Sequence, residues 1–526
     1  MDLATNQVFL TFLFRIKTQR LKKLSLDEKK EIDQPMMKNF GYFLFLLVIT
    51  LYSPVFFSTT NAMELKQEGI TQLQSVITED PLLKGAIAGI SIRSTTTGEI
   101  LYSYNGETSL TPASSFKLFT ATAALTTLGL DYTYQTEVST DGKWNKKGIV
   151  KGNLYLIGRG DPTLTVKDLN ILAKQLRKKG IRTIAGDVIA DDTWYDKVRY
   201  SIDLPWSDES AYYGAQISAL TVSPNEDYDA GTIIVQVTPS KKGKKPKTTL
   251  SPNTDYMVIH NKANTTEAGS NETLKITRGH GKNELVIEGT IPEDGSITQE
   301  WISVWDPTKY TLDLFKEELE REGIHVKGDC YIGKAADKTL EIVTHKSEPL
   351  SEILIPFLKL SNNTIAEMLV KEMGKVTQNL GTWEAGLETE KRVLTQLGVD
   401  INNMVFRDGS GISHLNTTQA NTVTQLLYRA QLQEWFPAFY KALPVAGEKE
   451  KIIGGTLRKR MTKSSLKQKV IAKTGTLTNV SSISGYMQTK SGENVIFSIV
   501  INHLQDDKEV KKVEDKILTV MLNYLE

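Results

Sequence analysis

Three short strings in this 526-residue chain combine hydroxyl groups with lysines and an asparagine amide, and they occur in a fixed order. They are Ser114-Ser115-Phe116-Lys117, Ser361-Asn362-Asn363 and Lys473-Thr474-Gly475-Thr476. A lysine three residues after a serine lies on the same helix face, so a neutral amine can accept the serine proton without a histidine. The third string offers a cation and two hydroxyls to a carboxylate. Together the strings predict a serine nucleophile that forms an acyl-enzyme.

Each string alone is a weak signal, because a chain of this length contains similar strings by chance. The first pattern recurs at residues 464–467, and the second at residues 103–105, 223–225 and 251–253. In isolation Ser114 would be interpreted as a helix cap and Lys473 as a solvated charge at a strand edge. The occurrence of all three in order, each in a suitable element, favours the catalytic interpretation.

The first string opens a predicted buried helix over residues 114–128. Pro112 precedes this run, and Gly129 follows where a helix would end. Ser114 therefore lies at a helix start, where its backbone N–H has no partner within the helix and can point at a developing oxyanion.

The third string lies on a predicted strand over residues 469–477. Strands over residues 482–488 and 495–502 follow, which predicts an antiparallel meander. A hairpin over residues 87–104 is expected to join it. The helix over residues 508–525 is apolar at helical spacing, and we expect it to pack on the sheet rather than to lie on a membrane surface.

Ser361 is expected in a loop between helical segments over residues 354–360 and 364–375. Its hydroxyl and the amide of Asn363 would then face inward, where they suit a proton relay and a holder for a substrate amide. Gly475 has no side chain and is expected to let a substrate backbone lie close against its strand.

At these strings the chain resembles the class C low-molecular-mass penicillin-binding proteins, which are the D-alanyl-D-alanine carboxypeptidases and endopeptidases of bacterial cell-wall metabolism. Further similar segments are residues 160–164, 191–194, 213–220 and 408–413. The resemblance covers residues 63–526. It implies an α+β fold like that of serine beta-lactamases and DD-peptidases, with an antiparallel sheet flanked by helices and two nested, strand-rich domains inserted.

The separation of Ser114 from Ser361, about 250 residues, is far more than a loop between neighbouring elements needs. It predicts inserted domains and argues against a class A beta-lactamase. The predicted boundaries are 1–62 for an N-terminal extension and signal peptide, 63–138 plus 345–526 for the catalytic domain, 139–162 plus 251–344 for a β-rich inserted domain, and 163–250 for a second, α/β inserted domain.

The resemblance also implies a role for each site residue. Ser114 attacks the carbonyl of a D-Ala residue, while Lys117, made neutral by burial and by nearby Lys473, accepts its proton. The backbone N–H groups of Ser114 and Thr476 hold the oxyanion, and Ser361 relays the proton to the departing amine. The groups expected to hold the substrate carboxylate and amide are Asn363, Lys473, Thr474, Gly475 and Thr476.

Some members of that family have a pocket for the free amino-acid end of a diaminopimelate side chain. Positions here that resemble it are Trp206, Asp208 and Leu477 and, less closely, Glu209 and Tyr212. His414 stands where an arginine is common after Asp-Gly-Ser-Gly-x-Ser. A histidine binds a carboxylate less strongly near neutral pH.

The composition predicts a globular protein with several cores, since 40% of the residues are hydrophobic and 24% are charged. The net charge of +1 argues against a nucleic-acid-binding protein. The six histidines form no pair at ligand spacing, which predicts neither a metal nor a cofactor. Cys330 is the single cysteine, so no internal disulfide is possible.

The N-terminal segment predicts export. An apolar run over residues 40–57 precedes Thr60-Asn61-Ala62, which satisfies the small-residue rule for cleavage. We therefore expect a secreted protein at the cell wall or the outer face of the membrane; an uncleaved run would be long enough for a membrane anchor. Lysine-rich segments at 143–151 and 241–247 are interpreted as solvated loops by default, with binding to anionic wall polymers or the membrane surface as the alternative hypothesis.

The expected partners are peptidoglycan stem peptides and beta-lactam antibiotics. A rival interpretation is a penicillin-binding receptor that senses wall peptides without turnover, and steady release of D-Ala separates the two. A second rival is a secreted beta-lactamase or esterase, which a comparison of penicillin turnover with peptide hydrolysis decides.

Overall fold

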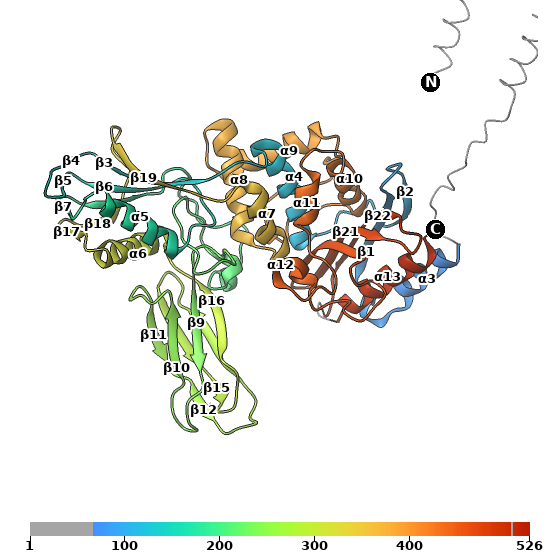
Figure 1. Ribbon diagram of the computed structural model, residues 1–526. Helices are drawn as coiled ribbons and strands as arrows, with labels where there is room; N and C mark the ends of the chain where they lie inside the picture. Colours follow the sequence, from blue (N-terminus) through green and yellow to red (C-terminus); the bar gives the residue numbers. More distant parts are fainter. Residues whose placement is uncertain (1–66, 507–508, 526) are drawn as a thin grey trace, which may run out of the picture. The chain divides into compact units, whose positions relative to one another are not determined.

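The computed structural model describes residues 67–506 and 509–525. The predicted extension and signal peptide, residues 1–62, lie outside the described residues. Within them the chain is a mixed α+β protein with a five-stranded antiparallel sheet built from its first and last strands and five further sheets, of two to five strands each, in the long insertion (Figure 1).

The five-stranded antiparallel sheet has the order β2-β1-β22-β21-β20. Its strands are β1 (Ile87–Ser94), β2 (Ile100–Tyr104), β20 (Val470–Leu477), β21 (Val480–Gln488) and β22 (Asn494–Asn502). Nearly every residue of β21 and β22 is buried, because helices cover both faces of the sheet. The predicted meander and the predicted hairpin that joins it are both confirmed.

One face of the sheet packs against α3 (Gln67–Glu79) and α13 (Lys511–Tyr524), as Figure 1 shows. Val513, Ile517 and Met521 of α13 are fully buried in this core. The predicted packing of the last helix on the sheet is therefore confirmed. No helix within the described ranges has both the length and the apolar character needed to cross a membrane.

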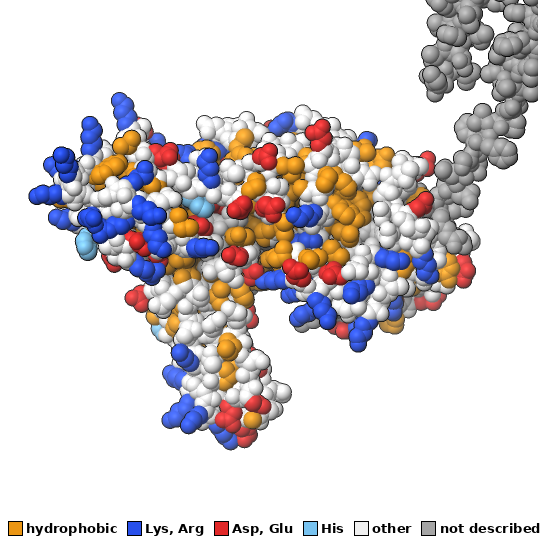
Figure 2. All heavy atoms as spheres, in the orientation of Figure 1, with side chains coloured by type: hydrophobic (Ala, Val, Ile, Leu, Met, Phe, Trp, Pro, Cys, Tyr) orange, Lys and Arg blue, Asp and Glu red, His pale blue; other side chains and the backbone are white. Residues whose placement is uncertain are grey.

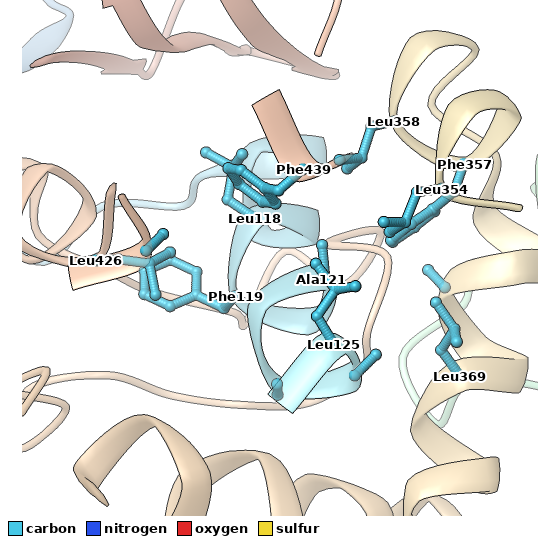
Figure 3. Packing of buried hydrophobic residues seen from close by; sticks show 14 of the residues in the cluster. Leu118, Phe119, Ala121, Leu125, Leu354, Phe357, Leu358, Leu369, Leu426 and Phe439 are labelled. Carbon is cyan, nitrogen blue, oxygen red and sulfur yellow. The ribbon is translucent and has the colours of Figure 1, made fainter. Parts of the chain in front are cut away.

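A layer of helices packs against the other face. It contains α4 (Lys117–Leu128), α7 (Leu350–Lys359), α8 (Asn363–Gln378), α9 (Trp383–Gln396), α10 (Ala420–Ala430), α11 (Phe436–Lys441) and α12 (Lys451–Gly454). Helix α4 lies at the centre, where Leu118 and Phe119 meet residues of α7, α10 and α11 (Figure 3). Small side chains such as Ala121 and Ala124 are buried in this core and allow neighbouring helices to approach α4 closely.

The insertion between α4 and α7 forms the remaining sheets. Its first and last strands are β3 (Gln135–Thr140), β4 (Lys143–Trp144), β5 (Ile149–Lys151), β6 (Leu154–Gly158), β7 (Thr183–Ile184), β8 (Val188–Asp191), β17 (His325–Val326), β18 (Cys330–Ile332) and β19 (Leu340–Lys346). They build two sheets, with helices α5 (Val166–Lys178) and α6 (Pro307–Arg321). The middle strands are β9 (Thr232–Thr238), β10 (Lys247–Ser251), β11 (Val258–Asn261), β12 (Asn264–Thr266), β13 (Lys275–Arg278), β14 (Glu284–Glu288), β15 (Thr290–Pro292) and β16 (Thr298–Ser303).

Strand pairing divides the insertion differently from the predicted boundaries. Strands β7 and β8 pair in parallel with β17 and β18, so residues 183–191 join the sheets that contain β3 to β6. Strand β9 pairs instead with β10 and β16. We therefore propose that residues 232–303 form the inner inserted domain and that the segments on either side of it form the outer one.

Candidate active site

Ser114 lies on a tight 3-10 turn, Ala113–Phe116, that leads directly into α4. The predicted helix over residues 114–128 is thus a 3-10 turn followed by an α-helix, which ends at Gly129 as expected. Sheet residue Ser482 fixes the turn, because its Oγ donates to the carbonyl of Pro112 at 2.6 Å and bonds the hydroxyl of Ser115 at 2.8 Å. The nucleophile candidate is therefore held by the sheet and by the central helix together.

Gly475 of β20 permits the close contact between strand and turn. A Cβ at this position would lie 2.6 Å from the carbonyl oxygen of Pro112 and 2.9 Å from the backbone nitrogen of Ser114. Those distances are shorter than side-chain carbons tolerate. The structure gives this glycine a further reason, because the protein's own Ser114 turn needs the room. The close approach of a substrate backbone stays a prediction.

Lys117 has no solvent exposure, and its amine meets three partners. Its Nζ lies 3.0 Å from Ser114 Oγ, 2.6 Å from Asn363 Oδ1 and 2.8 Å from the carbonyl of Ser410. Burial lowers the pKa of Lys117 to about 7, although the charges of Glu367 and Asp408 act in the opposite direction. Near neutral pH a large fraction of this amine is therefore unprotonated and can accept a proton.

Lys473 holds the second hydroxyl of the site. Its Nζ donates to Ser361 Oγ at 2.8 Å and to the carbonyl of Thr474 at 2.7 Å. Burial and the neighbouring charge of Lys117 lower the pKa of Lys473 well below its usual range. Ser361 has a positive φ of 62°, a strained conformation for a residue with a side chain. Ser361 lies in the loop between α7 and α8, as predicted, and its hydroxyl faces Lys473.

The two asparagines after Ser361 have separate tasks. The side chain of Asn362 caps α8 by accepting from the N–H of Ile365 at 2.9 Å. Asn363 presents its Oδ1 to Lys117 and donates from Nδ2 to the carbonyl of Tyr213 at 2.9 Å. The insertion thus contacts the site directly through Tyr213.

Two buried carboxylates lie behind Lys117, and sequence reasoning did not assign them to the site. Glu367 accepts from the backbone N–H groups of Gly409 and Ser410, at 3.0 and 2.8 Å, and so orients the Ser410 carbonyl that meets Lys117. Asp408 accepts from the N–H groups of Gly411 and Ser413, both at 2.8 Å. Burial, together with the charge of Glu367, raises the pKa of Asp408 to about 7.

Ser114, Ser361 and Asn363 open onto a cleft of about 420 Å³. Its lining includes Ser114, Ser361, Asn363, Thr474 and Thr476, together with Asp208, Tyr212, His414 and Leu477 of the predicted side-chain pocket. Residues that the sequence did not indicate also line it: Pro205, Tyr213, Leu360, Ile412, Thr456 and Thr478. The three strings therefore meet around one cleft, as the sequence predicts.

Two predicted pocket residues lie elsewhere. Trp206 is on the same 3-10 turn as Asp208, but it is 78% exposed and does not line the cleft. Glu209 is buried, and its carboxylate lies 2.9 Å from His280 and 3.5 Å from Arg278. Within the described residues no group of three or more metal-ligating side chains is placed to hold an ion.

Comparison with known proteins identifies the family. The model of the D-Ala-D-Ala carboxypeptidase 3 (S13) family matches residues 70–524. The chain belongs to this family. A D-alanyl-D-alanine carboxypeptidase of an Actinomadura species is 44% identical over 430 residues, which cover 81% of this chain and 79% of that protein.

Two comparisons with Haemophilus influenzae proteins extend this result to the fold. Its D-alanyl-D-alanine carboxypeptidase DacB is 25% identical over 465 residues, which cover 87% of this carboxypeptidase-family chain and 91% of that protein. The crystal structure of its penicillin-binding protein 4 (dacB) matches with a TM-score of 0.75 at 23% identity and covers 86% of this chain and 99% of that one. The family member described here therefore has the fold of that penicillin-binding protein.

Proposed function

We propose that this chain is a serine D-alanyl-D-alanine carboxypeptidase and endopeptidase that cleaves peptidoglycan peptides through an acyl-enzyme on Ser114, and that beta-lactams acylate the same hydroxyl. The observation that carries the proposal is the buried amine of Lys117, 3.0 Å from Ser114 Oγ, with its pKa lowered to about 7. Membership of the carboxypeptidase family supports the same reaction.

In the proposed reaction the Ser114 oxygen forms a bond to the carbonyl carbon of the penultimate D-Ala, and its proton moves to Lys117. The oxyanion forms beside the N–H groups of Ser114 and Thr476. The C–N bond then breaks, and Ser361, held by Lys473, passes a proton to the departing amine. Water hydrolyses the ester and frees Ser114, whereas a beta-lactam leaves an acyl group that departs slowly.

Substrate binding uses the rest of the cleft. The terminal carboxylate meets Lys473, Thr474 and Thr476, while Asn363 holds the amide of the substrate. The side chain that precedes the cleaved bond extends toward Asp208, His414 and Leu477, with Tyr212 beside them. Trp206 precedes Asp208 on the same 3-10 turn, but it is exposed and does not line the cleft, so we assign it no contact with the bound side chain.

Mass spectrometry after incubation with benzylpenicillin tests the proposal. We expect one covalent adduct on Ser114, which Ser114→Ala abolishes together with D-Ala release from a pentapeptide that ends in D-Ala-D-Ala. Ser464→Ala is the matched control, since Ser464 opens a chance copy of the first string. An adduct without steady D-Ala release would indicate a receptor, and rapid penicillin turnover without peptide hydrolysis would indicate a beta-lactamase.

We also propose that the protein acts outside the cytoplasm after export and that its insertion contacts anionic wall polymers or the membrane surface. Exposed lysines gather on β4, β5 and the turn between them, in the part of the insertion where Figure 2 shows many Lys and Arg side chains. A second exposed group lies at residues 241–247. Charge reversal of the five lysines in 241–247 should weaken salt-sensitive binding to isolated walls, and unchanged binding would refute this role for the loop.

A further inference from the structure

A second hollow, of about 400 Å³, lies next to the catalytic cleft. Its lining is formed by Tyr212, Asp227, Asp229, Trp301, Leu360, Lys451, Thr456 and Arg458. Tyr212, Leu360 and Thr456 line both cavities. A ligand in the cleft can therefore continue into this hollow past the shared wall.

The shared wall is at the end of the cleft where the leaving group of the proposed reaction would lie. The Oγ1 of Thr474, a proposed ligand of the substrate's terminal carboxylate, donates to the hydroxyl of Thr456 at 2.7 Å. Of the residues assigned to the acyl side, Asp208, His414 and Leu477 do not line the second hollow, and Tyr212 lies on the wall between the two cavities. A group attached to the departing amine is thus directed toward Thr456 and beyond it.

The hollow is built into the catalytic loop. The side-chain amide of Asn362, next to Ser361, donates to the carbonyls of Asp227 and Tyr228 at 3.2 and 2.8 Å and to Asp229 Oδ1 at 3.1 Å. These bonds tie residues 227–229 of the insertion to the start of α8. The wall of the hollow therefore keeps a fixed position relative to the hydroxyl of Ser361.

Of the four Asp, Lys and Arg side chains in the hollow, Arg458 suits a ligand that carries a carboxylate. Asp229 accepts from Asn362, and burial raises the pKa of this carboxyl to about 7, which reduces its negative charge near neutral pH. Lys451 is paired with Asp227 at the rim. Arg458 is partly buried and donates to the carbonyl of Gly455 at 2.8 Å; among the residues that the structure describes, no carboxylate lies within ion-pair distance of it. A guanidinium with remaining donors is well matched to a carboxylate. Trp301 and Leu360 supply apolar surface beside it.

We propose that this hollow binds the second stem peptide of a cross-link, the peptide chain carried by the leaving amine, with a carboxylate of that chain on Arg458. The inference rests on the proposed function and deepens it, because it assigns the recognition of cross-linked substrate to a place distinct from the acyl-side pocket. The bond that breaks is again the amide at the carbonyl of a D-Ala residue. The released amine belongs to a peptide rather than to free D-Ala.

The test compares two substrates: a linear pentapeptide that ends in D-Ala-D-Ala, and a cross-linked dimer in which the second stem peptide is the leaving group. For Arg458→Gln we expect the KM for the dimer to rise about fivefold to tenfold, with partial recovery in Arg458→Lys. Hydrolysis of the linear peptide and acylation by benzylpenicillin should stay within about twofold of wild type, which also reports correct folding. Lys459→Gln, at the exposed neighbouring lysine, should change neither substrate.

An equal loss on both substrates, or no loss on the dimer, would overturn the inference while leaving the proposed function intact. A wild-type protein that hydrolyses the linear peptide but not the dimer would overturn the inference together with the endopeptidase part of the proposed function, and would leave the carboxypeptidase part intact. A wild-type protein that releases no D-Ala from the linear peptide would instead refute the proposed function, on which the inference depends.

Discussion

The base and the rim of the catalytic cleft differ in their access to water. At the base, Lys117 and Lys473 have no exposure, and each amine has a hydroxyl and a carbonyl within hydrogen-bond distance. At the rim, Tyr212 is 45% exposed and His414 also reaches solvent. Charges interact more strongly where water is excluded. The base should therefore decide whether a reaction occurs, and the rim should decide only which peptide is preferred.

The largest effect should follow from removing the buried base. Lys117→Ala leaves Ser114 without a proton acceptor, so we expect the second-order rate constant for acylation by benzylpenicillin to fall about 100- to 10,000-fold. Stopped-flow or quenched mass spectrometry measures this rate. Lys467→Ala is the matched control, because Lys467 ends the chance copy of the string. A folded Lys117→Ala protein that benzylpenicillin acylates at the wild-type rate would contradict the assignment of catalysis to the base of the cleft.

Gly475→Ala tests the close contact at the base. The new methyl group would collide with the Pro112 carbonyl and the Ser114 backbone, so the turn that carries the nucleophile must shift. Displacements of this kind lower rates by about 100-fold, and overpacking costs about 1–3 kcal/mol of stability. Acylation kinetics and denaturant unfolding measure the two effects. In Gly279→Ala a Cβ would meet nothing closer than 3.8 Å, and both quantities should be unchanged.

The pH dependence of acylation tests the charge balance at the base. Only the neutral amine accepts a proton, so the rate should rise with pH and reach its half-maximum near the lowered pKa of Lys117, about 7. The negative charge of Glu367 stabilises the Lys117 ammonium and so raises its pKa. In Glu367→Gln this stabilisation is lost, and the midpoint of the pH profile should move to lower pH. At pH 6 the rate, relative to its plateau, should then be about threefold above wild type, equivalent to half a pKa unit.

Asp408 responds to the same substitution, because burial and the charge of Glu367 together raise its pKa. Without the Glu367 charge, Asp408 carries more negative charge, which supports the Lys117 ammonium and offsets part of the shift. A midpoint that stays in place, or one that moves to higher pH, would contradict a net electrostatic effect of Glu367 on Lys117.

The residues at the base were predictable because local geometry sets most of their placement. Ser114 and Lys117 are one turn apart, and Lys473 lies on an identifiable strand together with the rest of its string. Glu367 was missed because its partners come from a loop about 40 residues away in the sequence. A usable signal existed, since Glu367 lies four residues after Asn363 on the same helix face.

The rim and the insertion depended on contacts that local patterns do not contain. Trp206, Asp208 and Glu209 are adjacent in sequence, yet one is exposed, one lines the cleft and one binds Arg278 and His280. The direction of each side chain on such a turn follows from tertiary packing. The parallel pairing of β7 with β17 joins segments about 140 residues apart, so the limits of the inserted domains could not be placed from strand patterns alone.

The smallest effect is expected at the rim. His414→Arg places a permanently charged guanidinium beside Asp208 and Leu477, where a carboxylate on the substrate side chain can meet it. We expect the KM for a peptide whose side chain ends in a free amino acid to fall about threefold, because a partly exposed ion pair contributes roughly 0.2–1 kcal/mol. His325→Arg, at an exposed position of the insertion, is the control and should have no effect. Benzylpenicillin lacks this peptide side chain, so the rate at which it acylates Ser114 should not change. A 100-fold change in that acylation rate would place His414 with the base of the cleft and remove the distinction between the two regions.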